Sequence, residues 1–105
     1  MATREIAGKN IEFDDDGFMV DHTQWDENIA KAIAKEEGID PLTDRHFDVL
    51  KFMRKEFEEK GDGPSIRALK KRGGIPTKEL YELFPDGPAK KAARIAGIKK
   101  PTGCV

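Results

Sequence analysis

The stretch from Thr43 to Lys60, TDRHFDVLKFMRKEFEEK, predicts the longest helix of this chain. Thr43 is a typical N-cap residue, and apolar residues follow it at the three- and four-residue spacing of a helix face. The wide buried face of this helix consists of Phe47, Val49, Leu50, Phe52, Met53 and Phe57. Gly61 and the pair Gly63-Pro64 are expected to end the helix.

The residues before this helix predict a small antiparallel meander and one further helix. Short apolar runs over residues 3–20 are separated by turn signals at 8–10 and 14–17. Their apolar positions are Ile6, Ile11, Phe13, Phe18 and Val20. A helix is expected near 24–37, with Thr23 as its N-cap, because Trp25, Ile29 and Ile33 recur every four residues.

The residues after the long helix predict three short helices and a tail. Ser65 opens SIRALKKR, Thr77 opens KELYELF, and Pro88 takes the first position of AKKAARIA. The expected fold class is α+β, with a small meander packed on an array of about five helices. We expect one domain over residues 1–97 and a flexible C-terminal arm over 98–105.

Composition bounds the class of protein. The chain has 105 residues, and 37% of them are hydrophobic and 37% charged, which is typical of one globular domain. No apolar run approaches the ~20 residues of a membrane span. The N-terminus lacks the apolar core of a secretory signal, so a cytoplasmic location is expected.

Charge is unevenly distributed along the chain. Residues 1–52 carry 6 Lys/Arg against 13 Asp/Glu, hence −7, and residues 53–105 carry 13 against 7, hence +6. Either the C-terminal half meets an anionic partner, or the two halves attract each other.

The only cysteine, Cys104, stands next to the last residue. From Gly97 to Cys104 is seven residues, which extend to roughly 23–25 Å. A tail of this reach could place a reactive thiol in another protein's pocket, although an incidental tail cysteine is the alternative. Nearby cations, among them Lys100, would favour the thiolate, whereas the terminal carboxylate opposes it.

Other chemistry finds little support. One cysteine and two histidines, His22 and His46, lack the paired spacing of zinc ligands, so we expect no metal and no cofactor. The triplet Asp14-Asp15-Asp16 fits a tight turn better than a calcium loop. The motifs of α/β-hydrolases, zinc proteases and phosphate-binding loops are absent.

Residues 65–84 allow one alternative function. Two short helices with a turn between them, and the basic run Lys70-Lys71-Arg72, are compatible with a helix-turn-helix nucleic-acid-binding or regulatory module. However, the second helix carries Glu79 and Glu82, whereas a helix that reads bases usually offers Arg, Lys, Asn or Gln.

The stretches LYELFPDGPAKKAARIAGIKKPTGCV (80–105) and DGPSIRAL (62–69) together resemble the DsrC/TusE family of sulfur-carrier proteins. GFMVDHTQW and DRHFDVLKFMR extend the resemblance over nearly the whole chain. The resemblance implies a meander packed on helices, followed by a C-terminal arm. It also implies sulfurtransferase-type activity, in which the arm cysteine accepts sulfane sulfur as a persulfide and hands it to a partner protein.

Carried over by residue, the resemblance assigns the persulfide to Cys104. It places Arg67 near the docked arm, and Lys90, Lys91, Arg94 and Lys100 would add to a positive docking surface. The implied partners are sulfur donors and acceptors, either other sulfur-relay proteins of tRNA thiolation or dissimilatory sulfite reductase. A noncatalytic docking subunit of that reductase is a further alternative.

The chain departs from the family at one position. Members that work with sulfite reductase usually carry a second arm cysteine eleven residues before the last, and Ala93 stands there. The single cysteine resembles the TusE branch, whereas the compact GGIPTKELYELFP resembles the sulfite-reductase branch.

Overall fold

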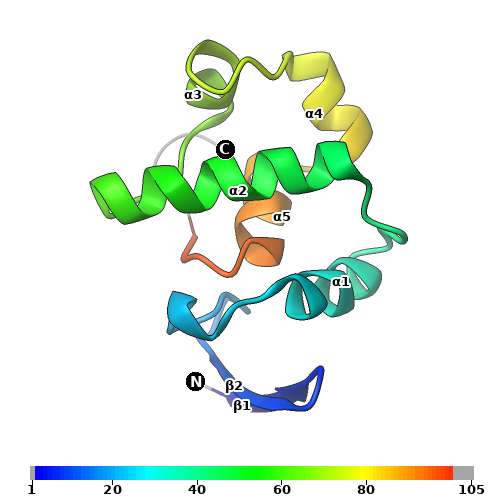
Figure 1. Ribbon diagram of the computed structural model, residues 1–105, viewed down its shortest axis with the longest axis vertical. Coiled ribbons are helices and arrows are strands. Elements are labelled where there is room, and N and C mark those ends of the chain that lie inside the picture. Colours follow the sequence, from blue (N-terminus) through cyan, green and yellow to red (C-terminus); the bar gives the residue numbers. More distant parts are fainter. Residues whose placement is uncertain (1, 101–105) are drawn as a thin grey trace.

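The long central helix forms as its sequence predicts. The computed structural model describes residues 2–100. In it, helix α2 spans Asp44–Lys60 and crosses the middle of the molecule (Figure 1). Thr43 accepts a hydrogen bond from the backbone of His46, while Nδ1 of His46 accepts one from the Thr43 N–H, 3.0 Å away. Gly61, with φ 75°, ends the helix in the left-handed region.

The N-terminal residues form a hairpin rather than a full meander. Strands β1 (Ala2–Ile6) and β2 (Lys9–Phe13) pair antiparallel, with Arg4 opposite Ile11. The third predicted run contributes only an isolated bridge between Phe13 and Met19. Within this run Phe18 and Met19 are buried, whereas the apolar residue Val20 is 49% exposed.

The acidic triplet forms a tight turn. The Asp14 carboxylate accepts hydrogen bonds from the backbone N–H groups of Asp16 and Phe18, both at 2.9 Å. This is the local side-chain bonding that favours aspartate in turns.

The next helix starts later than predicted. His22–Gln24 form a 3₁₀ turn, and helix α1 spans Glu27–Glu36. Asp26, and not Thr23, caps α1, because its carboxylate accepts a hydrogen bond from the Ile29 N–H at 2.9 Å. Trp25 therefore precedes the helix, while Ile29 and Ile33 line its buried face.

The three C-terminal helices lie where the sequence predicts them. Helices α3 (Ile66–Lys71) and α4 (Thr77–Leu83) pack against each other, and α5 (Pro88–Ile95) packs against α1, α2 and α4. Helix α5 lies beside α2. The hairpin and α1 lie on one side of α2, and α3 and α4 lie on the other (Figure 1). Its side chains at 89, 92, 93 and 95 are fully buried, so α5 is the centre of the core.

The core extends one residue into the predicted arm. Ile98 is 1% exposed, and its N–H donates to the Ala93 carbonyl at 3.2 Å. The predicted boundary at residue 98 therefore falls inside packed structure, whereas Lys99 and Lys100 are exposed. Residues 101–105, including Cys104, lie outside the described residues.

Candidate functional site: the basic face of helix α5

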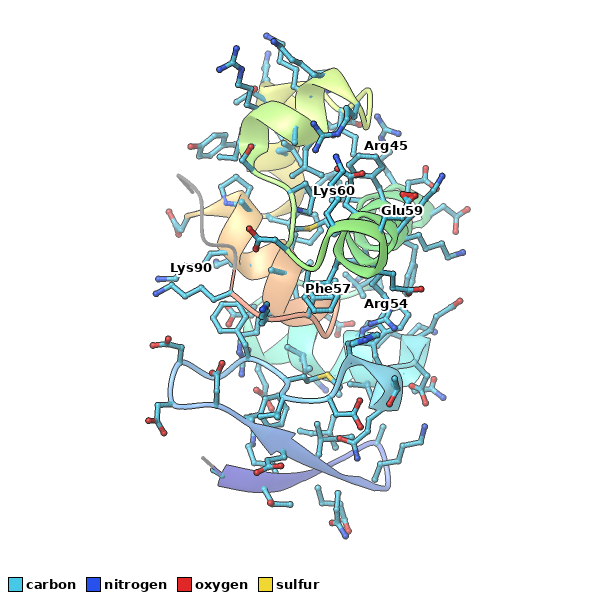
Figure 2. All side chains as sticks on the ribbon, turned by 90° about the vertical axis from the view of Figure 1, so that its left-hand side faces the viewer. Arg45, Arg54, Phe57, Glu59, Lys60 and Lys90 are labelled. Atoms are coloured by element: carbon cyan, nitrogen blue, oxygen red, sulfur yellow. The ribbon has the colours of Figure 1, made fainter. Side chains whose placement is uncertain are left out.

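A surface cavity lies along the exposed side of α5. Its volume is about 270 Å³, and it is lined by Asp16, Phe18, Glu37, Asp86, Lys90, Lys91 and Arg94. We call it the α5 cavity. Pro88 begins the helix, with Gly87 before it in the left-handed region at φ 90°. This start directs Lys90 and Lys91 to the surface, and Lys90 points away from the core in Figure 2.

Lys90 and Lys91 supply the uncommitted positive charge of this cavity. Lys90 is exposed and Lys91 is half-buried. Neither ammonium makes an ion pair with any residue in the range 2–100. Both charges are therefore available to an anionic group.

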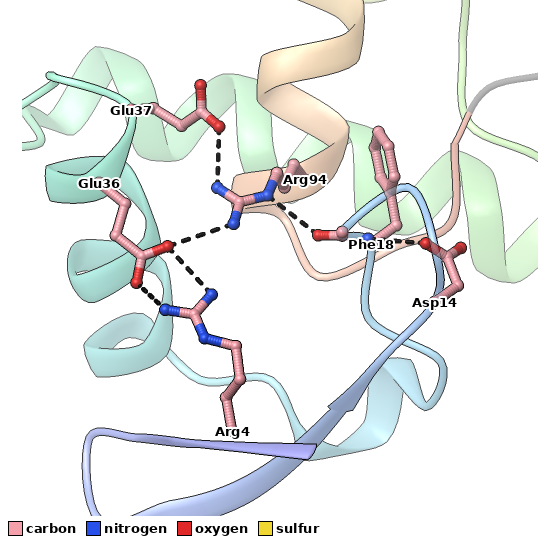
Figure 3. A network of polar contacts seen from close by, with 7 residues as sticks. Arg4, Asp14, Phe18, Glu36, Glu37 and Arg94 are labelled. Carbon is pink, nitrogen blue, oxygen red and sulfur yellow. Dashed lines mark hydrogen bonds and ion pairs between the residues drawn. The ribbon is translucent and has the colours of Figure 1, made fainter. Parts of the chain in front are cut away.

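Arg94 lines the same cavity but its charge serves the fold. Its guanidinium donates to Glu37 at 2.8 Å, to Glu36 at 3.2 Å and to the Gly17 carbonyl at 2.9 Å (Figure 3). The side chain is only 17% exposed. The carboxylates of Glu36, the last residue of α1, and of Glu37 after it already balance this cation, so it adds little to a free positive surface.

Lys100 brings the last described part of the chain to the cavity. Its ammonium lies 4.0 Å from a carboxylate oxygen of Asp16, which lines the cavity. Cys104 follows four residues later, outside the part of the chain that the structure describes. The structure thus brings four of the predicted site residues together: Lys90, Lys91, Arg94 and Lys100.

Arg67 does not join this group. It is exposed on α3, which packs against α4, and it does not line the α5 cavity. Its guanidinium makes no ion pair within residues 2–100. Its predicted role toward the arm stays a prediction.

Sequence reasoning missed the residues that hold the end of α5. The Trp25 indole N–H donates to the Ile95 carbonyl at 2.8 Å, and the Arg54 guanidinium donates to the Ala96 carbonyl at 2.8 Å. Burial lowers the pKa of Arg54 from its usual value, while the charge of Glu58 opposes this shift. A signal for Arg54 was present, because it occupies a position of the apolar stripe that contains Leu50 and Phe57.

The histidines serve structure. His46 packs its ring edge-on against Phe84 and places Nε2 3.0 Å from the Leu83 carbonyl. His22 packs against Phe57 with ring centroids 5.1 Å apart. Within residues 2–100 no group of three or more His, Cys, Asp or Glu side chains could hold a metal ion.

Helix α4 of the α3–α4 pair is bonded to α2 through its acidic residue Glu79. Arg45 of α2 donates to both carboxylate oxygens of Glu79, at 3.0 and 2.8 Å. Helix α4 therefore turns this side toward α2, which does not favour its use as a base-reading helix. Among residues 2–100, no helix is both long and apolar enough to cross a membrane.

Comparisons with known proteins agree along the whole chain. The family described as "DsrC like protein" matches residues 5–105. The dissimilatory-type sulfite reductase subunit gamma of Nitratidesulfovibrio vulgaris is 38% identical over 105 residues, covering 100% of both chains. Sulfurtransferase TusE of Pectobacterium atrosepticum is 39% identical over 110 positions, covering 96% of this chain and 98% of TusE.

The same kinship is visible in three dimensions. The solution structure of DsrC from Allochromatium vinosum superposes with a TM-score of 0.82 at 39% identity, covering 98% of this chain and 97% of that one. The hairpin and the helical array described above are therefore the arrangement of that structure.

Proposed function

This chain belongs to the DsrC/TusE family of sulfur-relay proteins, and on that premise we propose that it carries sulfane sulfur as a persulfide on Cys104. The single observation that carries the proposal is the match of residues 5–105, because it runs through the terminal segment that holds the only cysteine. The chain thus serves as a sulfurtransferase-type carrier between a donor protein and an acceptor protein.

The chemistry needs only one thiol and no cofactor. The Cys104 thiolate attacks the outer sulfur of a donor persulfide. A new S–S bond forms to Sγ, the donor's S–S bond breaks, and the donor leaves as a thiolate that takes up the proton lost by Cys104. The acceptor thiol repeats the step in reverse order, so the carrier ends as it began and no external oxidant or reductant is consumed.

The basic face of α5 suits an anionic sulfur species. A thiolate or persulfide on the arm is negative, and Lys90 and Lys91 are the uncommitted cations of the α5 cavity. Cations near a thiol favour its reactive thiolate form. Lys100 begins the arm at the cavity rim, so we propose that the arm can rest there between transfers.

Partners follow from the relatives. The family includes a subunit of dissimilatory sulfite reductase and the sulfurtransferase TusE, so the partners are proteins of sulfur relay or sulfur reduction. The alignment with the gamma subunit spans 105 positions and covers both chains fully. That with TusE needs 110 positions for 96% of this chain, so it contains gaps. In length this chain therefore resembles the gamma subunit, whereas its single cysteine resembles the TusE branch.

The test is an intact mass after incubation with inorganic polysulfide. The wild-type protein should gain about 32 Da per sulfur atom through its ionised thiol, and Cys104→Ser should gain none. Equal loading of both proteins, or no loading of the wild type, would end the persulfide proposal.

A second part of the experiment tests whether Lys90 and Lys91 speed the loading of sulfur. Changing both Lys90 and Lys91 to Gln should slow loading at low salt by about fivefold, since two charges at ~8 Å in water favour the thiolate by about 1 kcal/mol. The matched control makes the same change to Gln at Lys70 and Lys71, two neighbouring lysines of α3 that do not line the α5 cavity. Equal slowing by both pairs would indicate a general effect of net charge instead of docking.

A further inference from the structure

The end of α5 is held by side chains from two other parts of the chain. The last carbonyl groups of a helix have no partner within the helix. Here Trp25 donates to the Ile95 carbonyl and Arg54 donates to the Ala96 carbonyl, both at 2.8 Å. Two neighbouring carbonyls of the buried residues Ile95 and Ala96 are thus given partners by a residue before α1 and a residue of α2.

These two side chains also hold each other. The Arg54 guanidinium lies 4.4 Å from the centre of the Trp25 ring, within the range of a cation–π contact. Its second nitrogen donates to the His22 carbonyl at 3.0 Å. One guanidinium therefore joins the indole, the 3₁₀ turn and the end of α5, and we call Trp25 and Arg54 the clamp.

The clamp determines how the chain leaves the core. Directly after Ala96, Gly97 adopts φ 71° with the Trp25 ring against its Cα, and Ile98 is buried. The Lys99 ammonium then lies 6.0 Å from the Phe57 ring of α2, and Lys100 pairs with Asp16 at the α5 cavity. Figure 2 shows Phe57 next to this exit.

We propose that Trp25 and Arg54 are positioning residues for sulfur transfer, because they fix the point and the direction from which the cysteine arm leaves α5. This inference rests on the proposed function of Cys104. It extends that function from the thiol to two residues 50 to 80 positions away in sequence.

The expected effect follows from the length of the tether. With the clamp closed, Cys104 lies six residues after Ile98, and a tether of this length reaches roughly 20–22 Å. If the last turn of α5 is released, the tether grows to about ten residues. The effective concentration of the thiol at a fixed point then falls by at least about twofold from length alone, and loss of direction adds to this.

The test measures where Cys104 can reach, by trapping it with a second cysteine. Lys90→Cys marks the α5 cavity. Asn28→Cys, three residues after the clamp tryptophan, marks an exposed site on α1. In each full-length protein, the effective molarity of the Cys104 disulfide is measured at equilibrium with glutathione and glutathione disulfide, which supplies the oxidising equivalents.

The clamp variants are compared by the ratio of these two effective molarities. With the clamp residues unchanged, the effective molarity should be higher for Lys90→Cys than for Asn28→Cys. Arg54→Met and Trp25→Phe should lower this ratio at least twofold, and Arg54→Lys should restore part of it because one cationic donor remains. The matched control is Arg45→Met, an arginine of the same helix whose guanidinium holds Glu79 instead of α5.

Each outcome decides the proposal. A lower ratio in both clamp variants, but not in Arg45→Met, supports positioning, because a general loss of stability would move the control as well. An unchanged ratio in either Arg54→Met or Trp25→Phe overturns it. Polysulfide loading of the wild type is measured in parallel, so failure of the carrier proposal, seen as no loading of Cys104, is distinguished from failure of the clamp proposal, seen as an unchanged ratio.

Discussion

Gly97 is the residue at which the packed core meets the arm. Its φ of 71° lies in the left-handed region that L side chains rarely adopt. A Cβ there would lie 2.8 Å from Cγ of Trp25 and 2.9 Å from Sδ of Met19. This glycine is therefore required for two independent reasons, backbone conformation and close packing.

Gly97→Ala should destabilise the protein strongly. A left-handed alanine costs roughly 1–2 kcal/mol and overpacking roughly 1–3 kcal/mol more, so the free energy of unfolding in urea should fall by about 2–5 kcal/mol. Gly61→Ala is the matched control, because Gly61 has φ 75° at the end of α2 and open space where its Cβ would be. It should lose only the backbone part. Equal losses in the two variants would show that the Trp25 contact yields without cost.

At the scale of elements, one network of ion pairs joins the hairpin, α1 and α5. Arg4 of β1 donates to both carboxylate oxygens of Glu36, and Arg94 of α5 donates to Glu36 and Glu37 (Figure 3). Cations from both sides thus meet the carboxylates at the end of α1. The contacts of Arg94 support the reading in which the basic and acidic halves of the chain attract each other.

This network makes stability depend on pH. The hydrogen bond from Arg4, and after it that from Arg94, holds the pKa of Glu36 below its ordinary value against the opposing effect of burial. A carboxyl with a lowered folded pKa stabilises the fold above its unfolded pKa of about 4.3, and this contribution is lost as pH falls through the folded value. Glu36→Gln should therefore cost about 1 kcal/mol at pH 7 and flatten the loss of stability below pH 5.

The measurement is urea unfolding from pH 7 to pH 3. Glu5→Gln is the control, since Glu5 is on the opposite face of β1 from Arg4 and makes no ion pair within residues 2–100. If Glu36→Gln and wild type lose stability in parallel below pH 5, the network does not carry the acid sensitivity.

At the scale of the whole molecule, one cysteine restricts what oxidation can produce. No second thiol exists within the chain, so mild oxidant should give disulfide-linked dimers or mixed disulfides with small thiols. Ala93, the position of the missing second cysteine, lies fully buried in α5, and its carbonyl accepts the Ile98 N–H.

Ala93→Cys tests whether the arm can return to α5. The variant should form an intramolecular bond and migrate faster on a nonreducing gel, provided that the arm brings residue 104 within the ~4.4–6.8 Å Cα separation of a disulfide. Wild type should show dimers or mixed disulfides and no faster-migrating monomer. If the variant stays a reduced monomer under oxidant that dimerises wild type, the arm does not reach this side of α5.

Local chemistry explains why most elements were predictable. The boundaries of α2 follow from Thr43 and Gly61, and those of α3 and α5 from Ser65, Pro88 and Gly97, since caps act within one turn. The start of α1 was misplaced because Thr23 and Asp26 are both good caps, and only packing of Trp25 against α5 decided between them.

The sequence by itself determined the helical array, the basic character of α5 and the lone terminal thiol, because these depend on residue type and short-range spacing. Tertiary structure alone decided that Arg94 is neutralised while Lys90 and Lys91 stay free, that Arg67 lies outside the α5 cavity, and that Trp25 and Arg54 hold the end of α5. The physical reason is that charge balance and helix-end bonding depend on partners 40 to 70 residues away, and folding alone brings such partners together.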